Sequence, residues 1–419
     1  MQLSLTLVLT AIVSLAQSAV LPPPQPEPRQ TTGTPQIDYD TVVVGGGPAG
    51  LAALSGLARV RRNVLLIDSA EYRNGPTRHM HDVLGFDGVT PAYFRHAARQ
   101  QLTHYETVSW INGTVTSIVV GDPPKNSYFT ISSSNSSSSP STNITITARK
   151  VVLATGLRDI IPSTPGIVEN WGKGMFWCPW CDGHEHADQP LGLLGSLDNV
   201  PGNVRELVTL NKDLIAFVNG TDTPYYRNLT ESKFPKWETY LRLHNVTVDN
   251  RTIVSITRLR DGANHTADPS LPTAPEHDLF SIRLEDGTEV QRAGFFCNFP
   301  SEQSSKVGQE AGVVLYGGRL GVNPDRGLVT NVNGIYAIGD ANSDNTTNVP
   351  HALFSGKRTA VFVHVQLARE DADKELNGTA VAVRRDLWDR DLEVEARSLW
   401  GAVNGGPEDD ITYAGEFDI

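Results

Sequence analysis

Two cysteines separated by two residues, in Cys178-Pro-Trp-Cys181, are the most chemically distinctive feature of the 419-residue sequence. Sulfurs at this spacing can interconvert between a dithiol and a disulfide, and a pair that opens a helix favours the reactive thiolate. The chain has only 3 cysteines, and a loop as short as this one restricts the unfolded chain very little. A redox role therefore explains the pair better than a structural staple does.

A zinc site is the alternative use of the same cysteines. It would need two further ligands, for which Cys297, His184 and His186 are the candidates. The sequence has no second pair of cysteines at this spacing. We therefore predict no metal, and we interpret Cys297 as an ordinary buried thiol.

A glycine-rich turn, Gly45-Gly-Gly47-Pro48-Ala49-Gly50, has the G-x-G-x-x-G pattern of a dinucleotide site. Gly45 would allow the tight turn, Gly47 would let the backbone approach a pyrophosphate, and Gly50 would allow close helix packing. Asp68 lies 18 residues after Gly50, where a carboxylate can accept hydrogen bonds from ribose hydroxyls. A glycine turn without a ligand is the alternative, but the flanking elements favour the dinucleotide site.

Hydrophobic periodicity predicts the elements that position these residues. Residues 37–44 alternate and then become wholly apolar, as in a strand that enters a buried parallel sheet. Helical spacing follows through Leu51, Leu54, Leu57 and Ala58, and residues 63–67 form the next apolar strand, which completes a βαβ unit. Further strands are expected at 150–156, 191–194, 214–218, 252–256 and 334–340, with a helix at 355–368.

These segments predict an α/β fold with two Rossmann-like dinucleotide-binding domains, the second inserted in the first. The low-complexity stretch Ser132–Thr142 is expected to be a mobile hairpin tip or loop. The expected parts are a signal peptide at 1–19, a Pro-rich spacer or propeptide at 20–36, the first part of the cofactor domain at 37–160, an inserted domain carrying the cysteine pair at 161–295, the second part of the cofactor domain at 296–405, and an acidic tail at 406–419.

The N-terminus and the glycosylation acceptors predict a secreted glycoprotein. The first 16 residues are apolar but lack Lys or Arg, which leaves a buried helix as an alternative; the Pro-rich segment that follows argues against it. Ten Asn-X-Ser/Thr acceptors begin at Asn112, Asn135, Asn143, Asn219, Asn228, Asn245, Asn250, Asn264, Asn345 and Asn377. A net charge of -12 without a basic run argues against nucleic acid, and no other apolar run is long enough for a membrane span.

The segment Phe176–Glu185 resembles the low-molecular-weight thioredoxin reductase family, and in particular its fungal branch of secreted sulfhydryl oxidases and dithiol oxidases. The similarity extends over about residues 37–370, and it includes the segments Arg73–His81 and Asn348–Ala352. The resemblance implies a thioredoxin reductase-like fold, bound FAD and a homodimer.

The resemblance also implies roles for individual residues. Cys181 would face the flavin, Cys178 would exchange with the substrate thiol, and Asp182 would handle the proton. His184 could share this role or only fill a loop, and His351 could act as a base or only pack near the flavin. The implied cofactor-binding residues are Gly45, Gly47, Pro48, Ala49, Gly50, Asp68, His81, Ala154, Thr155, Gly156, Gly339 and Asp340.

The inserted domain departs from the reductase pattern. Its segment Leu191–Asp198 breaks the G-x-G spacing, and the next strand ends in Phe217-Val-Asn-Gly-Thr221, where the reductases have basic residues for the phosphate of NADPH. We therefore predict an FAD-dependent thiol oxidase that converts small thiols such as glutathione to disulfides and reduces O2 to H2O2. The alternatives are a dithiol oxidase acting on a secondary metabolite, an NADPH-dependent disulfide reductase, and a redox-inert FAD-binding protein.

Overall fold

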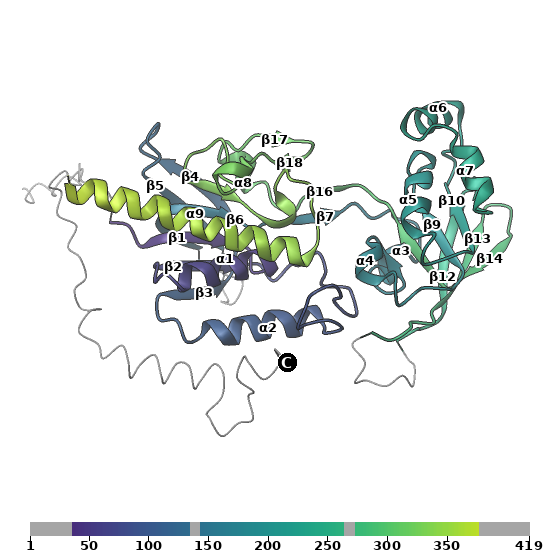
Figure 1. Cartoon of the computed structure of the whole chain (residues 1–419), viewed down its shortest axis with the longest axis horizontal. Helices are drawn as coiled ribbons and strands as arrows, with labels where there is room; N and C mark the ends of the chain where they lie inside the picture. The colour runs from purple at the N-terminus through teal and green to yellow at the C-terminus, as the bar shows by residue number, and fades with distance from the viewer. Residues whose placement is uncertain (1–35, 135–142, 264–272, 377–419) are drawn as a thin grey trace, which may run out of the picture. The chain divides into compact units, whose positions relative to one another are not determined.

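The computed structural model describes residues 36–134, 143–263 and 273–376 (Figure 1). The expected signal peptide, the spacer up to residue 35 and the acidic tail lie outside the described residues, as do the acceptors Asn135, Asn264 and Asn377. Across the three ranges that the structure describes, no helix is both long and apolar enough to cross a membrane.

A seven-stranded sheet forms the first domain, with the order β3-β2-β1-β6-β5-β4 and with β19 also paired to β6. The strands are β1 (Tyr39–Val44), β2 (Val64–Asp68), β3 (Val108–Asn112), β4 (Thr114–Gly121), β5 (Tyr128–Ser134), β6 (Asn143–Leu153) and β19 (Ile335–Ala337). The second half of β6 pairs in parallel with β1 on one side and with β19 on the other, and β2 and β3 extend the parallel sheet beyond β1. The first half of β6 pairs antiparallel with β5, which in turn pairs antiparallel with β4. The expected βαβ unit is confirmed.

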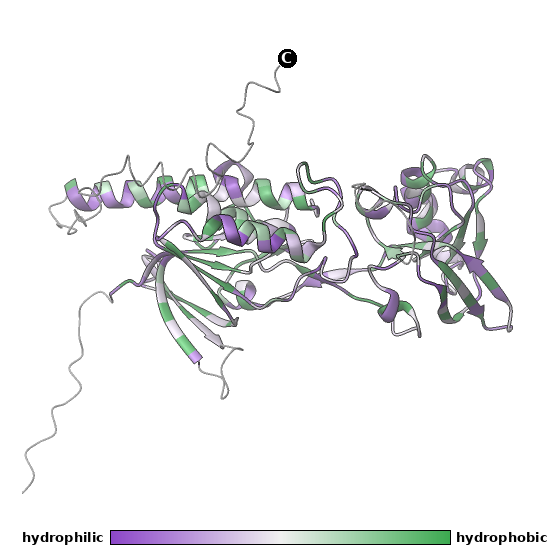
Figure 2. Cartoon of the chain, turned by 90° about the horizontal axis from the view of Figure 1, so that it is seen from below, coloured by the Kyte–Doolittle hydropathy of each residue, from purple (hydrophilic) through white to green (hydrophobic). Residues whose placement is uncertain are grey.

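Both faces of this sheet are covered, which explains why its central strands are wholly apolar. Val43 packs into a cluster with the helices α1 (Pro48–Ala58) and α9 (Val349–Leu376), while Val42 and Val44 pack on the opposite face against β4, β5 and α8 (Val307–Glu310). Figure 2 shows hydrophobic residues along much of these strands. The helix α2 (Pro91–Leu102) packs beside α1.

α1 and α9 lie side by side, and small residues bring their backbones close (Figure 1). A Cβ added to Gly56 would lie 2.6 Å from the Cβ of Ala360, and one added to Gly356 would lie 2.3 Å from the carbonyl oxygen of Ala49. α9 is longer than the helix expected at 355–368, since it begins at Val349 with Pro350 in its first turn, where a missing N–H costs nothing.

The inserted domain has its own five-stranded parallel sheet, with the order β11-β10-β9-β15-β8. Its strands are β8 (Met175–Phe176), β9 (Leu191–Leu194), β10 (Leu214–Phe217), β11 (Thr247–Asp249) and β15 (Gly294–Cys297), and its helices are α3 (Ile167–Asn170), α4 (Pro179–Asp182), η1 (Leu197–Asn199), α5 (Val200–Leu207), α6 (Pro224–Lys233) and α7 (Trp237–Leu243). An antiparallel sheet of β12 (Ile253–Arg260), β13 (Leu279–Leu284) and β14 (Glu289–Arg292) accompanies it. The expected α/β fold with two Rossmann-type sheets, the second inserted in the first domain, is confirmed.

Two expected boundaries move in the structure. The inserted domain extends to Cys297 rather than to residue 295, because β15 pairs with β9 through Cys297 and is fully buried. Residues 132–134 of the expected loop belong to β5, where serines alternate between the two faces of the strand. The chain leaves and re-enters the first domain through the antiparallel pair β7 (Leu157–Asp159) and β16 (Ser301–Gln303).

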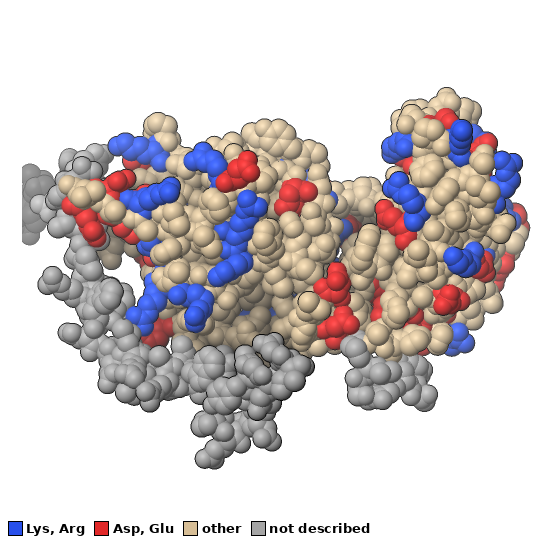
Figure 3. All heavy atoms as spheres, viewed as in Figure 1, with Lys and Arg blue, Asp and Glu red and all other residues tan. Residues whose placement is uncertain are grey.

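Short elements complete the second part of the first domain. They are β17 (Leu315–Tyr316), β18 (Arg319–Leu320), η2 (Pro324–Arg326) and η3 (Gly339–Ala341). On the face seen in Figure 3, basic and acidic side chains are interspersed over the described residues.

Candidate active site

The glycine turn between β1 and α1 lines one end of a cavity of about 540 Å³. Gly45 has a left-handed φ of +109°, and a Cβ on it would lie 2.4 Å from the carbonyl oxygen of Ala154. A Cβ on Gly50 would lie 1.9 Å from the carbonyl oxygen of Gly45. Gly47 differs, because its φ of -72° is ordinary and an added Cβ would meet only Tyr72, at 4.0 Å. The Gly47 backbone is therefore open to a ligand in the cavity.

Asp68 ends β2 beside this turn and is almost fully buried. Its Oδ1 accepts hydrogen bonds of 3.1 Å from the backbone N–H groups of Gly46 and Ala70. Its Oδ2 accepts from the Tyr72 hydroxyl at 2.5 Å and from the Arg99 guanidinium. Tyr72 and Arg99 belong to the site although sequence reasoning missed them, since nothing local in the sequence links Arg99 on α2 to Asp68.

Ala154, Thr155, Gly156, Gly339 and Asp340 line the same cavity, and two of them adjoin the glycine turn. A Cβ on Gly45 would lie 2.4 Å from the Ala154 carbonyl oxygen, and one on Gly339 would lie 2.8 Å from the Cβ of Ala49. The Thr155 hydroxyl is buried and has no hydrogen-bond partner among the described residues, and a Cβ on Gly156 would meet nothing within 4 Å. Buried polar groups normally have partners. An unpartnered hydroxyl and an open backbone in the cavity that the glycine turn lines fit a bound dinucleotide.

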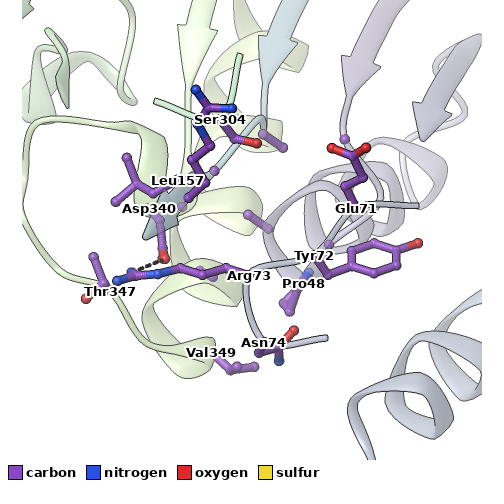
Figure 4. Close-up of a pocket in the computed structure, with 18 of the residues that line it drawn as sticks. Pro48, Glu71, Tyr72, Arg73, Asn74, Leu157, Ser304, Asp340, Thr347 and Val349 are labelled. Atoms are coloured by element: carbon purple, nitrogen blue, oxygen red, sulfur yellow. Dashed lines mark hydrogen bonds and ion pairs between the residues drawn. The ribbon is translucent and has the colours of Figure 1, made fainter. Parts of the chain in front are cut away.

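Arg73 reaches across the cavity to Asp340 (Figure 4). Its Nη1 lies 2.9 Å from Asp340 Oδ2, and its Nε and Nη2 donate to the two carboxylate oxygens of Asp159 at 3.0 and 2.6 Å. The guanidinium carbon lies 5.8 Å from the ring centre of Trp177. Arg73 thus contacts both Asp340, an expected cofactor-binding residue, and Trp177, which directly precedes the cysteine pair.

Two tryptophans form part of the cavity wall near the cysteine pair. The rings of Trp171 and Trp177 stack with centroids 4.7 Å apart and an interplanar angle of 6°. Phe299 also stacks on Trp171, with ring centroids 5.7 Å apart. These contacts hold the two indoles in the cavity wall.

Cys178 and Cys181 are joined in a disulfide, with their Cα atoms 5.2 Å apart. Cys178 is the N-cap of α4, so the pair opens a helical turn as expected. Cys181 lines the cavity, and Cys178 is not among the lining residues. Trp180, between them, is 70% exposed. One cysteine therefore lines the cavity, and the other is partly exposed and does not line it.

Asp182 follows Cys181 and also lines the cavity. Burial raises the pKa of its carboxyl group to about 7; the charge of His186 opposes this shift, and the Glu276 and Glu185 carboxylates add to it. A group that titrates near neutrality can exchange protons with thiols at physiological pH. The position and the pKa of Asp182 both suit the proton-handling role expected for it.

The three histidines of the expected site lie in different environments. His81 lines the cavity, and its nitrogens lie 3.5 Å from Asp87 and from Glu185. His184 has an exposed side chain and does not line the cavity. His351 is also absent from the cavity wall, although its neighbours Pro350 and Ala352 line it, and its Nε2 lies 2.8 Å from Asp344 Oδ2. Of these three histidines, the structure brings His81 alone to the cavity, where His79 is a further lining residue.

Cys297 is buried in β15 and does not line the cavity. Burial raises the pKa of its thiol well above the ordinary value, which disfavours the reactive thiolate. This environment suits the ordinary buried thiol that we expected.

The turn after β9 is where a second dinucleotide would bind. The Leu197 N–H donates to Thr221 Oγ1 at 3.0 Å, and Pro201 in the first turn of α5 has no N–H. Gly192 lies within β9, and a Cβ on it would lie 2.5 Å from the ring of Phe295 on the neighbouring strand β15. Asp198 follows this turn; burial favours its neutral form, but hydrogen bonds from Lys233 and Ser196 lower its pKa overall. Its carboxylate is paired with Lys233.

The fold, the glycine turn and the cysteine pair beside one cavity define a flavoprotein disulfide oxidoreductase. The chain belongs to the pyridine nucleotide-disulphide oxidoreductase family and has the thioredoxin reductase-like form, whose members bind FAD. The family model matches residues 39–208. FAD fits the residues described above, which line one cavity: the open Gly47 turn and Asp68, together with Thr155, Gly156 and Asp340.

Individual relatives agree with this membership. A "Probable thioredoxin reductase" of Arthroderma benhamiae is 43% identical over 413 residues, which cover 95% of this chain and 97% of the relative. "Thioredoxin reductase tcpT" of Claviceps purpurea is 30% identical over 339 residues, covering 78% and 94%. Among solved structures, an oxidoreductase from Agrobacterium tumefaciens superposes with a TM-score of 0.64 at 25% identity, covering 79% of this chain and 98% of that one.

Proposed function

We propose that the protein is a secreted, FAD-dependent thiol oxidase, which converts small thiols to disulfides through Cys178 and Cys181 and reduces O2 to H2O2. The turn after β9 carries the proposal. Asp198 there is already paired with Lys233, the Leu197 N–H is bound to Thr221, and Pro201 offers no donor. The phosphates of a nicotinamide dinucleotide would therefore find few free donors at this turn.

The reaction at the cysteine pair balances without a reductant. A substrate thiolate attacks Cys178 Sγ, and the Cys181 thiolate leaves. A second thiol group then displaces the Cys178 thiolate, which releases the substrate disulfide and leaves both cysteines reduced. Asp182 accepts a substrate thiol proton. Bound FAD would supply the two-electron acceptor that lets the Cys178–Cys181 disulfide re-form, with O2 as the final acceptor; overall, two thiols and one O2 would give one disulfide and one H2O2.

The substrate class follows from the side of the pair that meets solvent. The exposed indole of Trp180, between the two cysteines, offers an apolar surface beside the pair for a small thiol. Glutathione is the first candidate, and a small metabolite with two thiols is the second. A dithiol would release its disulfide without waiting for a second molecule, so it should be oxidised faster at low concentration.

The second candidate function is an NADPH-dependent disulfide reductase. The names of the two fungal relatives favour it, since both are described as thioredoxin reductases. The two functions differ in the source of electrons for FAD, and this difference can be measured directly.

The decisive experiment mixes the oxidised protein anaerobically with NADPH, and separately with glutathione and with dithiothreitol, while the flavin absorbance is followed. We expect the thiols to bleach the flavin and air to restore it, with formation of peroxide. Rapid bleaching by micromolar NADPH, with thiols without effect, would make the protein a reductase and contradict the proposal.

Secretion is supported by the placement of the glycosylation acceptors. All of those within the described residues have exposed side chains: Asn112, Asn143, Asn219, Asn228, Asn245, Asn250 and Asn345. An exported enzyme also lacks a regenerating supply of NADPH, which agrees with the use of O2. Glycosidase treatment of protein collected from culture medium tests this part, and light scattering tests the homodimer that the resemblance implies.

A further inference from the structure

His186 follows Cys181 by five residues and packs against the turn that carries the redox pair. Its side chain is 2% exposed, and its Nδ1 lies 2.9 Å from the carbonyl oxygen of Asp182. A carbonyl can only accept a hydrogen bond, so Nδ1 carries a proton and donates it. The imidazole packs on Phe176, with ring centres 5.0 Å apart. The ring therefore contacts both the strand that enters the cysteine pair and the turn that leaves it.

The other nitrogen of His186 faces two carboxylates. Nε2 lies 3.7 Å from Glu276 Oε2 and 3.8 Å from Asp278 Oδ2, and it has no hydrogen-bond partner among the described residues. A neutral imidazole would direct its lone pair at these two negative groups, whereas an N–H there is attracted to both. The geometry thus favours the doubly protonated imidazolium.

The charged groups around His186 come from three segments besides its own. Asp182 lies on the redox turn, Glu276 and Asp278 precede β13, and Arg78 of the first domain donates to both carboxylates. Burial lowers the pKa of His186, but the Asp278 carboxylate, the Asp182 carbonyl and Glu276 together raise it above the ordinary value of 6.5. The surrounding carboxylates therefore favour the charged form of His186, which together with Arg78 acts on the charge of Asp182.

We propose that His186 is a positioning residue that stays an imidazolium and sets the pH range over which Asp182 can accept the substrate proton. This inference rests on the proposed thiol oxidation. The positive charge favours the Asp182 carboxylate, and the Nδ1 hydrogen bond fixes the turn that carries it. His184, two residues earlier and exposed, has neither contact.

A divalent cation is the other ligand that these side chain types suggest, since ligand atoms of His186, Glu276 and Asp278 lie within 4.8 Å of one another. Arg78 Nη1 already donates to the same Glu276 and Asp278 oxygens that face His186. A cation there would lie next to the guanidinium, so the arrangement favours a proton on His186.

The first test compares His186→Asn with His277→Asn in the FAD-loaded protein. The Asn amide can keep the donor to the Asp182 carbonyl while it removes the charge, and His277 lies between the two carboxylates in the sequence but is exposed. The anaerobic rate of flavin bleaching by dithiothreitol is measured against pH. Because His186 lowers the pKa of Asp182, its loss should move the rising limb of the profile to higher pH, by about one unit for a single nearby charge. His277→Asn should leave the profile unchanged.

The second test measures the protonation state of His186 by NMR and does not depend on enzyme activity. In protein labelled with ¹⁵N-histidine, the signal that His186→Asn removes should remain that of an imidazolium well above pH 6.5. Glu276→Gln should lower the midpoint of that signal while it keeps a hydrogen-bonding partner for Arg78. This second variant keeps the test valid if His186→Asn folds poorly.

The outcomes separate this inference from the proposed function. A neutral His186 signal at pH 7, or an unchanged rate profile in a folded His186→Asn protein, would overturn the role of His186. If thiols fail to bleach the wild-type flavin at all, the proposed function fails instead, and the NMR titration still decides the charge of His186.

Discussion

Replacing Gly47 by valine should remove FAD without damaging the fold. Gly47 has an ordinary φ of -72°, and an added Cβ would meet no protein atom nearer than Tyr72 at 4.0 Å. The valine side chain would instead fill the space through which the backbone approaches the pyrophosphate. Losing one or two hydrogen bonds to a charged phosphate costs about 3 kcal/mol, which is about a hundredfold in Kd.

The matched control is Gly50→Ala. Its Cβ would lie 1.9 Å from the Gly45 carbonyl oxygen, so this smaller change must displace backbone and should destabilise the protein itself. The assay titrates cofactor-free protein with FAD and measures unfolding by urea in the same samples. Unchanged FAD affinity in the Gly47 variant, or an equal loss of stability in both variants, would refute the assignment of Gly47 to the cofactor and Gly50 to the fold.

Three further predictions concern the cysteine pair and its surroundings. Cys178→Ser and Cys181→Ser should each abolish thiol turnover and retain FAD, as measured by oxygen uptake and flavin absorbance; loss of FAD would indicate a structural role instead. Flavin reduction by thiols should slow as the pH falls below about 7, because protonated Asp182 cannot accept a proton, and Asp182→Asn should lose this limb of the profile. Arg78→Ala should cost about 3–5 kcal/mol in urea unfolding, because two buried carboxylates lose their partner; a near-zero change would mean that these acids are protonated or hydrated.

The local features of this protein could be predicted from the sequence. The turn from Gly45 to Gly50 and the pair Cys178–Cys181 depend on residues a few positions apart, and their periodic flanks identify the strand and helix on each side. The broken spacing after β9 was also visible, although only the structure shows that Phe295 fills the space at Gly192.

The contacts that complete the site join distant segments, and the sequence offers no local signal for them. Arg99 on α2 reaches Asp68 on β2, and Arg78 reaches the acids before β13. The sequence also did not show which of His184 and His186 is buried beside Asp182. α4 ends at Asp182, so no helical periodicity continues through these histidines to indicate which one is buried.

Trp171 and Trp177 stack in the cavity wall, so their fluorescence should report whether FAD is bound. Flavins absorb in the wavelength range where tryptophan emits, so a flavin in the same cavity should quench these two indoles by energy transfer. The sequence contains 7 tryptophans, and replacing this pair by phenylalanine should remove most of the emission change that accompanies FAD binding. Cofactor loading could then be followed in unlabelled protein, at concentrations far too low for absorbance.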